Sequence, residues 1–138
     1  MSGRVLVIDD LPFMRSLLRD VLSNAGFTVV AEAADGRQGM VAYARHEPDV
    51  VLLDITMPIM DGITALKRIM ELDPQARVVM CSSLGEQELI LRAIRLGARD
   101  FVVKPFRPER VTSAVHKALK NHSRSVRSSV RKGLESDG

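Results

Sequence analysis

The sequence alternates five times between a short apolar run and a longer segment whose apolar residues recur with helical spacing. The runs are RVLVI (4–8), FTVVAEA (27–33), DVVLLD (49–54), ARVVMCSS (76–83) and DFVVK (100–104). Runs of this length between polar or turn residues are typical of buried strands. Strands buried on both faces and alternating with helices predict a parallel sheet that helices cover on both sides.

The segments that follow these runs predict five helices, at 12–26, 35–47, 62–72, 86–97 and 108–121. In the first of them Phe13, Leu17 and Val21 recur every four residues, with Leu18 and Leu22 beside them, which predicts a single apolar face. Right-handed crossovers leave few topologies for five such units. We therefore predict the α/β class: a doubly wound, (βα)5 flavodoxin-like fold with a five-stranded parallel sheet of strand order 2-1-3-4-5.

Composition narrows the class of protein further. The 138 residues are 46% hydrophobic and 27% charged, which suits one globular domain with a real core. No apolar run approaches the roughly 20 residues that a membrane span needs, and the N-terminus lacks the pattern of a signal peptide. The single cysteine, Cys81, allows no internal disulfide. We expect a cytoplasmic protein.

The positive charge is concentrated near the C-terminus. Residues 107–132 hold eight Lys or Arg and one acid, Glu109, within a net charge of +3. A basic end suits nucleic acid, an acidic partner or merely a solvated face. We divide the chain into a domain at 1–121 and, at 122–138, a basic C-terminal tail or helix extension, since basic and apolar residues keep helical spacing as far as Lys132.

Carboxylates gather where a doubly wound sheet places its ligands. Asp9 and Asp10 follow the first strand and Asp54 ends the third, and these strands are neighbours in the predicted order. The carboxyl ends of the strands at this switch point form the ligand crevice. Mg²⁺ takes one or two carboxylates together with phosphate and water oxygens. A third carboxylate would remain as a nucleophile toward phosphorus.

Two further polar residues end strands at the same edge. Ser82 ends the fourth strand and Lys104 the fifth, and a hydroxyl and an ammonium both suit the oxygens of a transferred phosphoryl group. Each residue also has a structural interpretation. Asp54 or Ser82 could cap the helix that follows it, and Lys104 could simply neutralise the acids. Taken together, five polar residues on one edge favour a phosphoryl-transfer site.

The chain resembles a response-regulator receiver domain over about residues 3–120. The resemblance lies in VLVIDD, DVVLLDITMPIMDGI, VVMCSS and DFVVKPF, which occur in the expected order and spacing. It implies that Asp54 accepts a phosphoryl group from the phosphohistidine of a sensor kinase. It also implies Mg²⁺ as cofactor, with Asp10 and Asp54 as direct ligands, Asp9 acting largely through water, and Thr56 contributing its backbone carbonyl.

The same resemblance implies roles for the other residues of the edge. Ser82 would follow the phosphoryl group, Lys104 would pair with it, and Phe101 would be the switch aromatic, with a cis bond between Lys104 and Pro105. Such a domain is a signalling switch, and its only catalysis would be its own phosphoryl uptake and autodephosphorylation. DLPFMRSLL, CSSLGEQE and KPFRPERV are most similar to single-domain chemotaxis regulators of the CheY type.

A chemotaxis regulator would have protein partners: a sensor histidine kinase, a target such as a flagellar motor switch protein, and a phosphatase as a further candidate. The alternative is a receiver domain within a larger regulator, controlling a DNA-binding or enzymatic output. A flavin carrier or an aspartyl-nucleophile hydrolase on the same fold fits less well. The two aspartates would repel a flavin phosphate, and position 56 is Thr where such a hydrolase needs a second acid.

Overall fold

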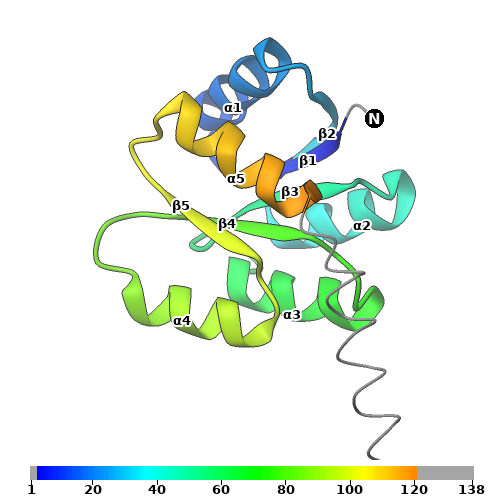
Figure 1. The fold of residues 1–138 in the computed structure, drawn as a ribbon. Coiled ribbons are helices and arrows are strands. Elements are labelled where there is room, and N and C mark those ends of the chain that lie inside the picture. The colour runs from blue at the N-terminus through cyan, green and yellow to red at the C-terminus, as the bar shows by residue number, and fades with distance from the viewer. Residues whose placement is uncertain (1–2, 121–138) are drawn as a thin grey trace, which may run out of the picture.

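The fold is a parallel sheet covered by helices on both faces, seen in a computed structural model that describes residues 3–120 (Figure 1). The strands are β1 (Arg4–Ile8), β2 (Thr28–Ala33), β3 (Val50–Asp54), β4 (Val78–Ser82) and β5 (Asp100–Val103). The helices are α1 (Pro12–Asn24), α2 (Gly36–His46), α3 (Gly62–Leu72), α4 (Gln87–Leu96) and α5 (Pro108–Lys120). Strands and helices alternate strictly, as the sequence predicts.

All neighbouring strands are parallel, in the order β2-β1-β3-β4-β5. The predicted fold class and strand order are therefore confirmed. The elements are up to a few residues shorter than their sequence patterns, because the flanking turn residues close each one. For example, α4 ends where Gly97 takes up a left-handed conformation at φ 116°, which glycine adopts without a Cβ clash.

Alternating residues of the central strands supply two separate apolar layers. Leu6 and Ile8 of β1 point into the layer beneath α2, α3 and α4, whereas Val5 and Val7 point into the layer beneath α1 and α5. The strands β1, β3 and β4 have almost no exposed residues. Because both faces are covered, their sequences are nearly continuous apolar runs rather than alternating ones.

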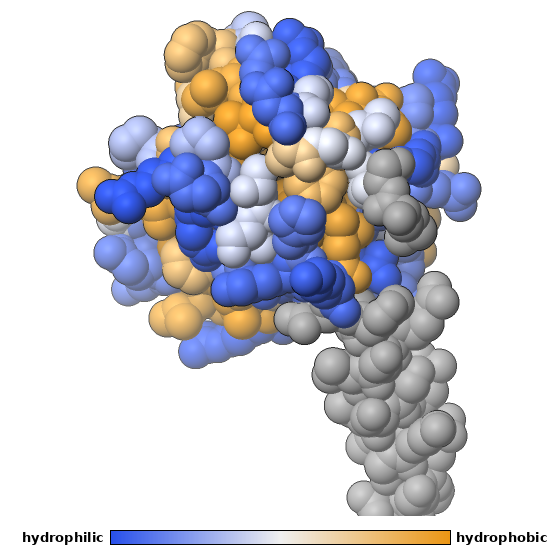
Figure 2. All heavy atoms as spheres, turned by 45° about the horizontal axis from the view of Figure 1, so that its top comes forward, coloured by the Kyte–Doolittle hydropathy of each residue, from blue (hydrophilic) through white to orange (hydrophobic). Residues whose placement is uncertain are grey.

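The buried face of α1 differs in part from the one that the sequence predicts. Leu18 and Leu22 are fully buried, but Phe13 is 74% exposed. The buried part of the stripe is centred on Leu18 and Leu22, and Phe13 in the first turn of α1 lies in solvent. On the face shown in Figure 2, apolar side chains are interspersed with hydrophilic ones.

Two predictions concern the end of the chain. The first places a boundary between a domain at 1–121 and a basic tail or helix extension at 122–138, and the second continues α5 toward Lys132. Both lie outside the described residues.

Within residues 3–120, no helix is both long enough and apolar enough to cross a membrane.

Candidate phosphoryl-transfer and magnesium site

The register of the sheet brings the predicted polar residues to one edge. Ile8 of β1 pairs with Leu53 of β3, so that the acids following β1 come beside Asp54. Asp54 pairs with Cys81, which places Ser82 one residue further along β4. Lys104 follows β5, and its backbone N–H donates a hydrogen bond of 2.7 Å to the Ser82 carbonyl. Strands β1, β3, β4 and β5 thus all contribute to one site.

Three carboxylates converge at this edge. One oxygen from each of Asp9, Asp10 and Asp54 lies within 4.8 Å of the other two. Asp9 is 1% exposed and Asp54 is 5% exposed, while Asp10 is half-buried. At an effective dielectric constant near 20, each pair of charges at that separation repels by about 3 kcal/mol. Such a cluster needs positive charge to compensate it.

Lys104 provides part of that charge. Its Nζ donates a hydrogen bond of 3.1 Å to Asp54 Oδ2 and lies 3.2 Å from Asp9 Oδ2. The contact with Asp9 is an ion pair without the geometry of a hydrogen bond, so Asp9 Oδ2 has no hydrogen-bond partner among residues 3–120. One ammonium against three carboxylates leaves a net charge of −2.

The protonation equilibria reflect this imbalance. Burial raises the pKa of Asp54 to about 6, and repulsion by Asp9 adds to that rise while the Lys104 ammonium opposes it. Burial alone would lower the pKa of Lys104, but attraction to Asp54 and Asp9 outweighs it and leaves that pKa raised. The lysine therefore stays charged while the charged form of Asp54 is disfavoured.

The donor set fits a hard divalent cation. Clustered carboxylate oxygens are the ligands that Mg²⁺ prefers, the residual charge of −2 matches its charge, and the buried Asp9 oxygen without a hydrogen bond is available to a metal-bound water. The predicted magnesium cofactor therefore suits the residues that the structure brings together.

The backbone around Asp9 is held by contacts that the sequence motif does not reveal. Asp9 Oδ1 accepts a hydrogen bond of 2.9 Å from the Leu11 backbone N–H. The Arg15 guanidinium donates a 2.6 Å hydrogen bond to the Asp9 carbonyl and lies 3.6 Å from the Glu32 carboxylate. Arg15 thus ties the first turn of α1 to the end of β1. Its position at the end of the first turn of α1, shortly after the acidic pair, is the only sequence signal for this role.

The loop between β3 and α3 is packed tightly against the end of β3. The Gly62 N–H donates a hydrogen bond of 2.6 Å to the Ile55 carbonyl, and a Cβ at Gly62 would lie 2.0 Å from the Asp54 carbonyl oxygen. The cap of α3 is Asp61, whose side chain accepts a hydrogen bond of 2.9 Å from the Thr64 N–H. Asp54 therefore does not cap the helix, and its carboxylate stays with Lys104 in the site.

Ser82 is also not a helix cap. Its side chain is fully buried, and its hydroxyl has no hydrogen-bond partner among the described residues. The residue at the N-cap of α4 is Glu86. A buried hydroxyl without a partner costs free energy, which leaves Ser82 Oγ ready to bond an oxygen that arrives from outside the chain.

Phe101 lies on β5, half-buried, beside a mostly apolar groove of about 400 Å³. The groove runs between α4 and β5 and also contacts the loop after Ser82. Its lining comprises Ser83, Leu84, Gly85, Glu86, Gln87, Ile90, Leu91, Phe101 and Val103. The Lys104–Pro105 peptide bond that follows is cis, as the sequence resemblance implies.

Glu86 is a site residue that sequence reasoning missed. Its Oε2 accepts a 2.6 Å hydrogen bond from the Thr56 hydroxyl, while its Oε1 accepts a hydrogen bond from the Ser83 backbone N–H. Glu86 thereby joins the loop after β3 to the loop after β4. Thirty residues separate Thr56 from Glu86, and no motif in the sequence links them.

Comparison with known proteins shows the family to which the chain belongs. The model of the response regulator receiver domain family matches residues 5–116, and the chain belongs to that family. It is 52% identical to the chemotaxis protein CheY of Bacillus subtilis over 119 residues, covering 86% of this chain and 99% of that protein. It is 48% identical to CheY of Thermotoga maritima over 120 residues, covering 87% of this chain and 100% of that protein.

A solved structure matches as well. In the CheX–CheY–BeF3–Mg complex from Borrelia burgdorferi, a chain superimposes with a TM-score of 0.79 at 42% sequence identity, covering 82% of this chain and 86% of that one. The predicted resemblance to CheY-type receivers and the predicted magnesium cofactor are therefore confirmed. A receiver of this kind is a signalling domain with an acidic site for phosphorylation and Mg²⁺, formed here by Asp9, Asp10 and Asp54.

Proposed function

We propose that this chain is a chemotaxis response regulator in which Asp54 accepts a phosphoryl group from the phosphohistidine of a sensor kinase. The observation that carries the proposal is the convergence of three carboxylates around one lysine at the carboxyl edge of the sheet. In the transfer, an Asp54 carboxylate oxygen forms a bond to phosphorus as the bond from phosphorus to the histidine nitrogen breaks. The nitrogen keeps the electron pair of the broken bond.

Each neighbouring residue has a role in this transfer. Asp10 and Asp54 would hold Mg²⁺ directly, together with the Thr56 backbone carbonyl, and Asp9 would hold it largely through water. The ion supplies positive charge toward the phosphoryl oxygens when it is bound. Lys104, already 3.1 Å from Asp54, would pair with the transferred group. The half-buried Asp10 suits direct coordination better than Asp9, which is 1% exposed and already paired with Lys104.

Ser82 and Phe101 would carry the response to phosphorylation. The unpartnered Ser82 hydroxyl would bond a phosphoryl oxygen, and the loop after β4 would move with it. Phe101 borders the groove that this loop lines, so its ring could turn inward to fill the vacated space. Phosphorylation would then shift the population between two packings of the α4–β5 surface.

The partners of such a regulator would be a histidine kinase and a target protein such as a component of the flagellar motor switch, and a phosphatase is a further candidate. Relatives that share about half of their residues with this chain are CheY proteins matched over nearly their whole length. This supports a stand-alone regulator over the alternative, a receiver that controls an attached DNA-binding or enzymatic output.

The proposal is tested by phosphorylation with acetyl phosphate and Mg²⁺, followed by intact mass measurement. We expect one added phosphoryl group on the wild type and none on Asp54→Asn. The matched control is Asp61→Asn, which removes the charge of an acid in the same loop that caps α3 and lies outside the acidic cluster. This variant should be labelled like the wild type. Labelling of Asp54→Asn at the wild-type level would refute the assignment.

A further inference from the structure

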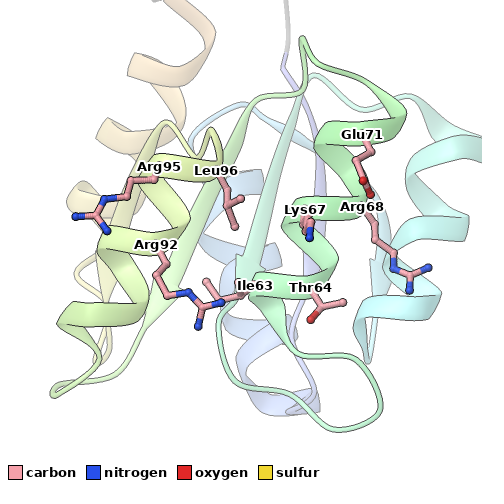
Figure 3. Close-up of a pocket in the computed structure, with 8 residues that line it drawn as sticks. All are labelled: Ile63, Thr64, Lys67, Arg68, Glu71, Arg92, Arg95 and Leu96. Carbon is pink, nitrogen blue, oxygen red and sulfur yellow. The ribbon is translucent and has the colours of Figure 1, made fainter.

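A groove of about 530 Å³ between α3 and α4 lies apart from the phosphorylation site (Figure 3). Helix α3 lines it with Ile63, Thr64, Lys67, Arg68 and Glu71, and α4 lines it with Arg92, Arg95 and Leu96. None of the acids of the phosphorylation site, nor Ser82, Phe101 or Lys104, belongs to this lining. The lining of the groove therefore does not overlap the site proposed for phosphorylation.

The groove carries far more positive than negative charge. Its four cationic side chains, Lys67, Arg68, Arg92 and Arg95, are exposed, and none forms an ion pair with a residue in 3–120. Glu71 is the single acid in the lining. Like charges at helical spacing, such as Arg92 and Arg95, destabilise a helix. Four cations against one acid leave the lining with a net charge of +3, which an anionic partner would neutralise.

The cations are spread across the groove rather than directed at one point. In Figure 3, Arg92 extends between the two helices toward Ile63 and Lys67 is seen nearly end-on over α3, whereas Arg68 and Arg95 point away to opposite sides. A site for a single phosphate would bring its donors together around one anion. Dispersed cations instead suit a ligand that carries several separated negative charges along its length.

Two apolar side chains, Ile63 and Leu96, lie at the base of the groove between the helices (Figure 3). Ile63 is 7% exposed and belongs to the buried core, and the partly buried Leu96 packs against the same core. A nucleic-acid backbone would offer this base only sugars and phosphates. A peptide can place an apolar side chain on it while its acidic residues meet the cations on the rims, as in helix-in-groove recognition.

We propose that the α3–α4 groove docks an acidic, amphipathic segment of a partner protein. Apolar side chains of that segment would contact Ile63 and Leu96, and its carboxylates would pair with Lys67 and Arg92 inside the groove and with Arg68 and Arg95 on the flanks. Because the cations are exposed, the interaction would weaken with rising salt.

The proposal is tested by NMR titration of the full ¹⁵N-labelled chain with a synthetic helical peptide, which consists of glutamates with leucines at helical spacing. We expect the changes in amide chemical shift to be concentrated at residues 63–71 and 92–96. A glutamate-only peptide of equal charge should bind at least tenfold more weakly, because it cannot contact the apolar base. Oligothymidylate of comparable charge and inorganic pyrophosphate serve as competing probes.

The variant Lys67→Glu/Arg92→Glu should lose at least tenfold in affinity for the peptide. The matched control is Lys117→Glu/Lys120→Glu on α5, which changes the net charge equally and should bind like the wild type. Equal losses in both variants would show diffuse attraction and overturn the proposal. Shift changes mapping elsewhere, or tighter binding of the oligonucleotide or pyrophosphate at this groove, would overturn it as well.

Discussion

The Thr56 hydroxyl donates a 2.6 Å hydrogen bond to the Glu86 carboxylate, which joins the loop after the phosphoacceptor strand to the loop after Ser82. The other Glu86 oxygen accepts a hydrogen bond from the Ser83 backbone N–H. A single carboxylate thus restrains both loops that would have to respond to a phosphoryl group on Asp54. Loss of this carboxylate should free the loop after β4.

We therefore expect Glu86→Ala to raise the hydrogen-exchange rate of the Ser83 amide about tenfold, which corresponds to about 1.4 kcal/mol, the order of one hydrogen bond to a charged acceptor. Glu86→Gln keeps an acceptor oxygen and should give a smaller increase. The matched control is Glu88→Ala, in the first turn of α4, for which no change at Ser83 is expected. An unchanged Ser83 rate in Glu86→Ala would show that the loop is held by other contacts.

Asp54 should destabilise the domain in the absence of Mg²⁺. Its pKa rises from 3.8 to about 6 on folding, so the folded state binds the proton more tightly than the unfolded state. The stabilising contribution of the protonated carboxyl is fully present below about pH 4 and is lost as the pH rises through 6. At pH 7 the ionised group therefore costs up to about 3 kcal/mol.

Asp54→Asn removes this charge, and we expect it to raise the free energy of unfolding at pH 7 by about 1–3 kcal/mol without metal. The gain should shrink as the pH falls from 7 toward 4, and it should also shrink at pH 7 when Mg²⁺ is added. Urea denaturation at several pH values, with and without Mg²⁺, measures both trends. Asp61→Ala, which removes the side-chain oxygen that caps α3, should instead destabilise the protein under all these conditions. A metal-free Asp54→Asn protein less stable than the wild type at pH 7 would contradict the prediction.

Phe101 should change its packing when the site is loaded. With beryllofluoride and Mg²⁺ as a phosphoryl mimic, we expect the ring resonances of Phe101 to shift, because the proposed movement of Ser82 would free space beside the groove that Phe101 lines. Ser82→Ala should still accept the mimic but should largely abolish the shift. Phe27, which packs on the opposite face against His116 at a ring-centroid distance of 4.9 Å, provides an internal control. Identical Phe101 resonances in both states would rule out the switch.

The fold and the acidic centre of the site could be predicted because local signals determine them. Buried parallel strands need continuous apolar runs, and the chain order of βα units leaves few topologies, so Asp9, Asp10 and Asp54 could be placed at one edge from sequence. Contacts between distant loops were not predictable in this way. The bond between Thr56 and Glu86 depends on two side-chain conformations, and the exposure of Phe13 depends on which turns of α1 pack against the sheet.

Gly62 shows that the site depends on backbone contact as well as on its acids. A Cβ at this position would lie 2.0 Å from the Asp54 carbonyl oxygen and 2.7 Å from the Ile55 Cα, both of which are backbone atoms that cannot move without distorting the end of β3. Gly62→Ala should therefore lower the free energy of unfolding by about 3 kcal/mol. It should also weaken Mg²⁺ binding, because it displaces the strand that carries Asp54.

The matched control for Gly62→Ala is Gly26→Ala. Gly26 has a φ of 90°, but a Cβ there would meet no atom within 4 Å. Its substitution should cost only the strain of a left-handed residue, about 1 kcal/mol, and should leave Mg²⁺ affinity unchanged. Urea denaturation and Mg²⁺ titration of both variants give the comparison. Equal losses of stability, with Mg²⁺ affinity unchanged in Gly62→Ala, would show that the loop after β3 can shift without disturbing Asp54.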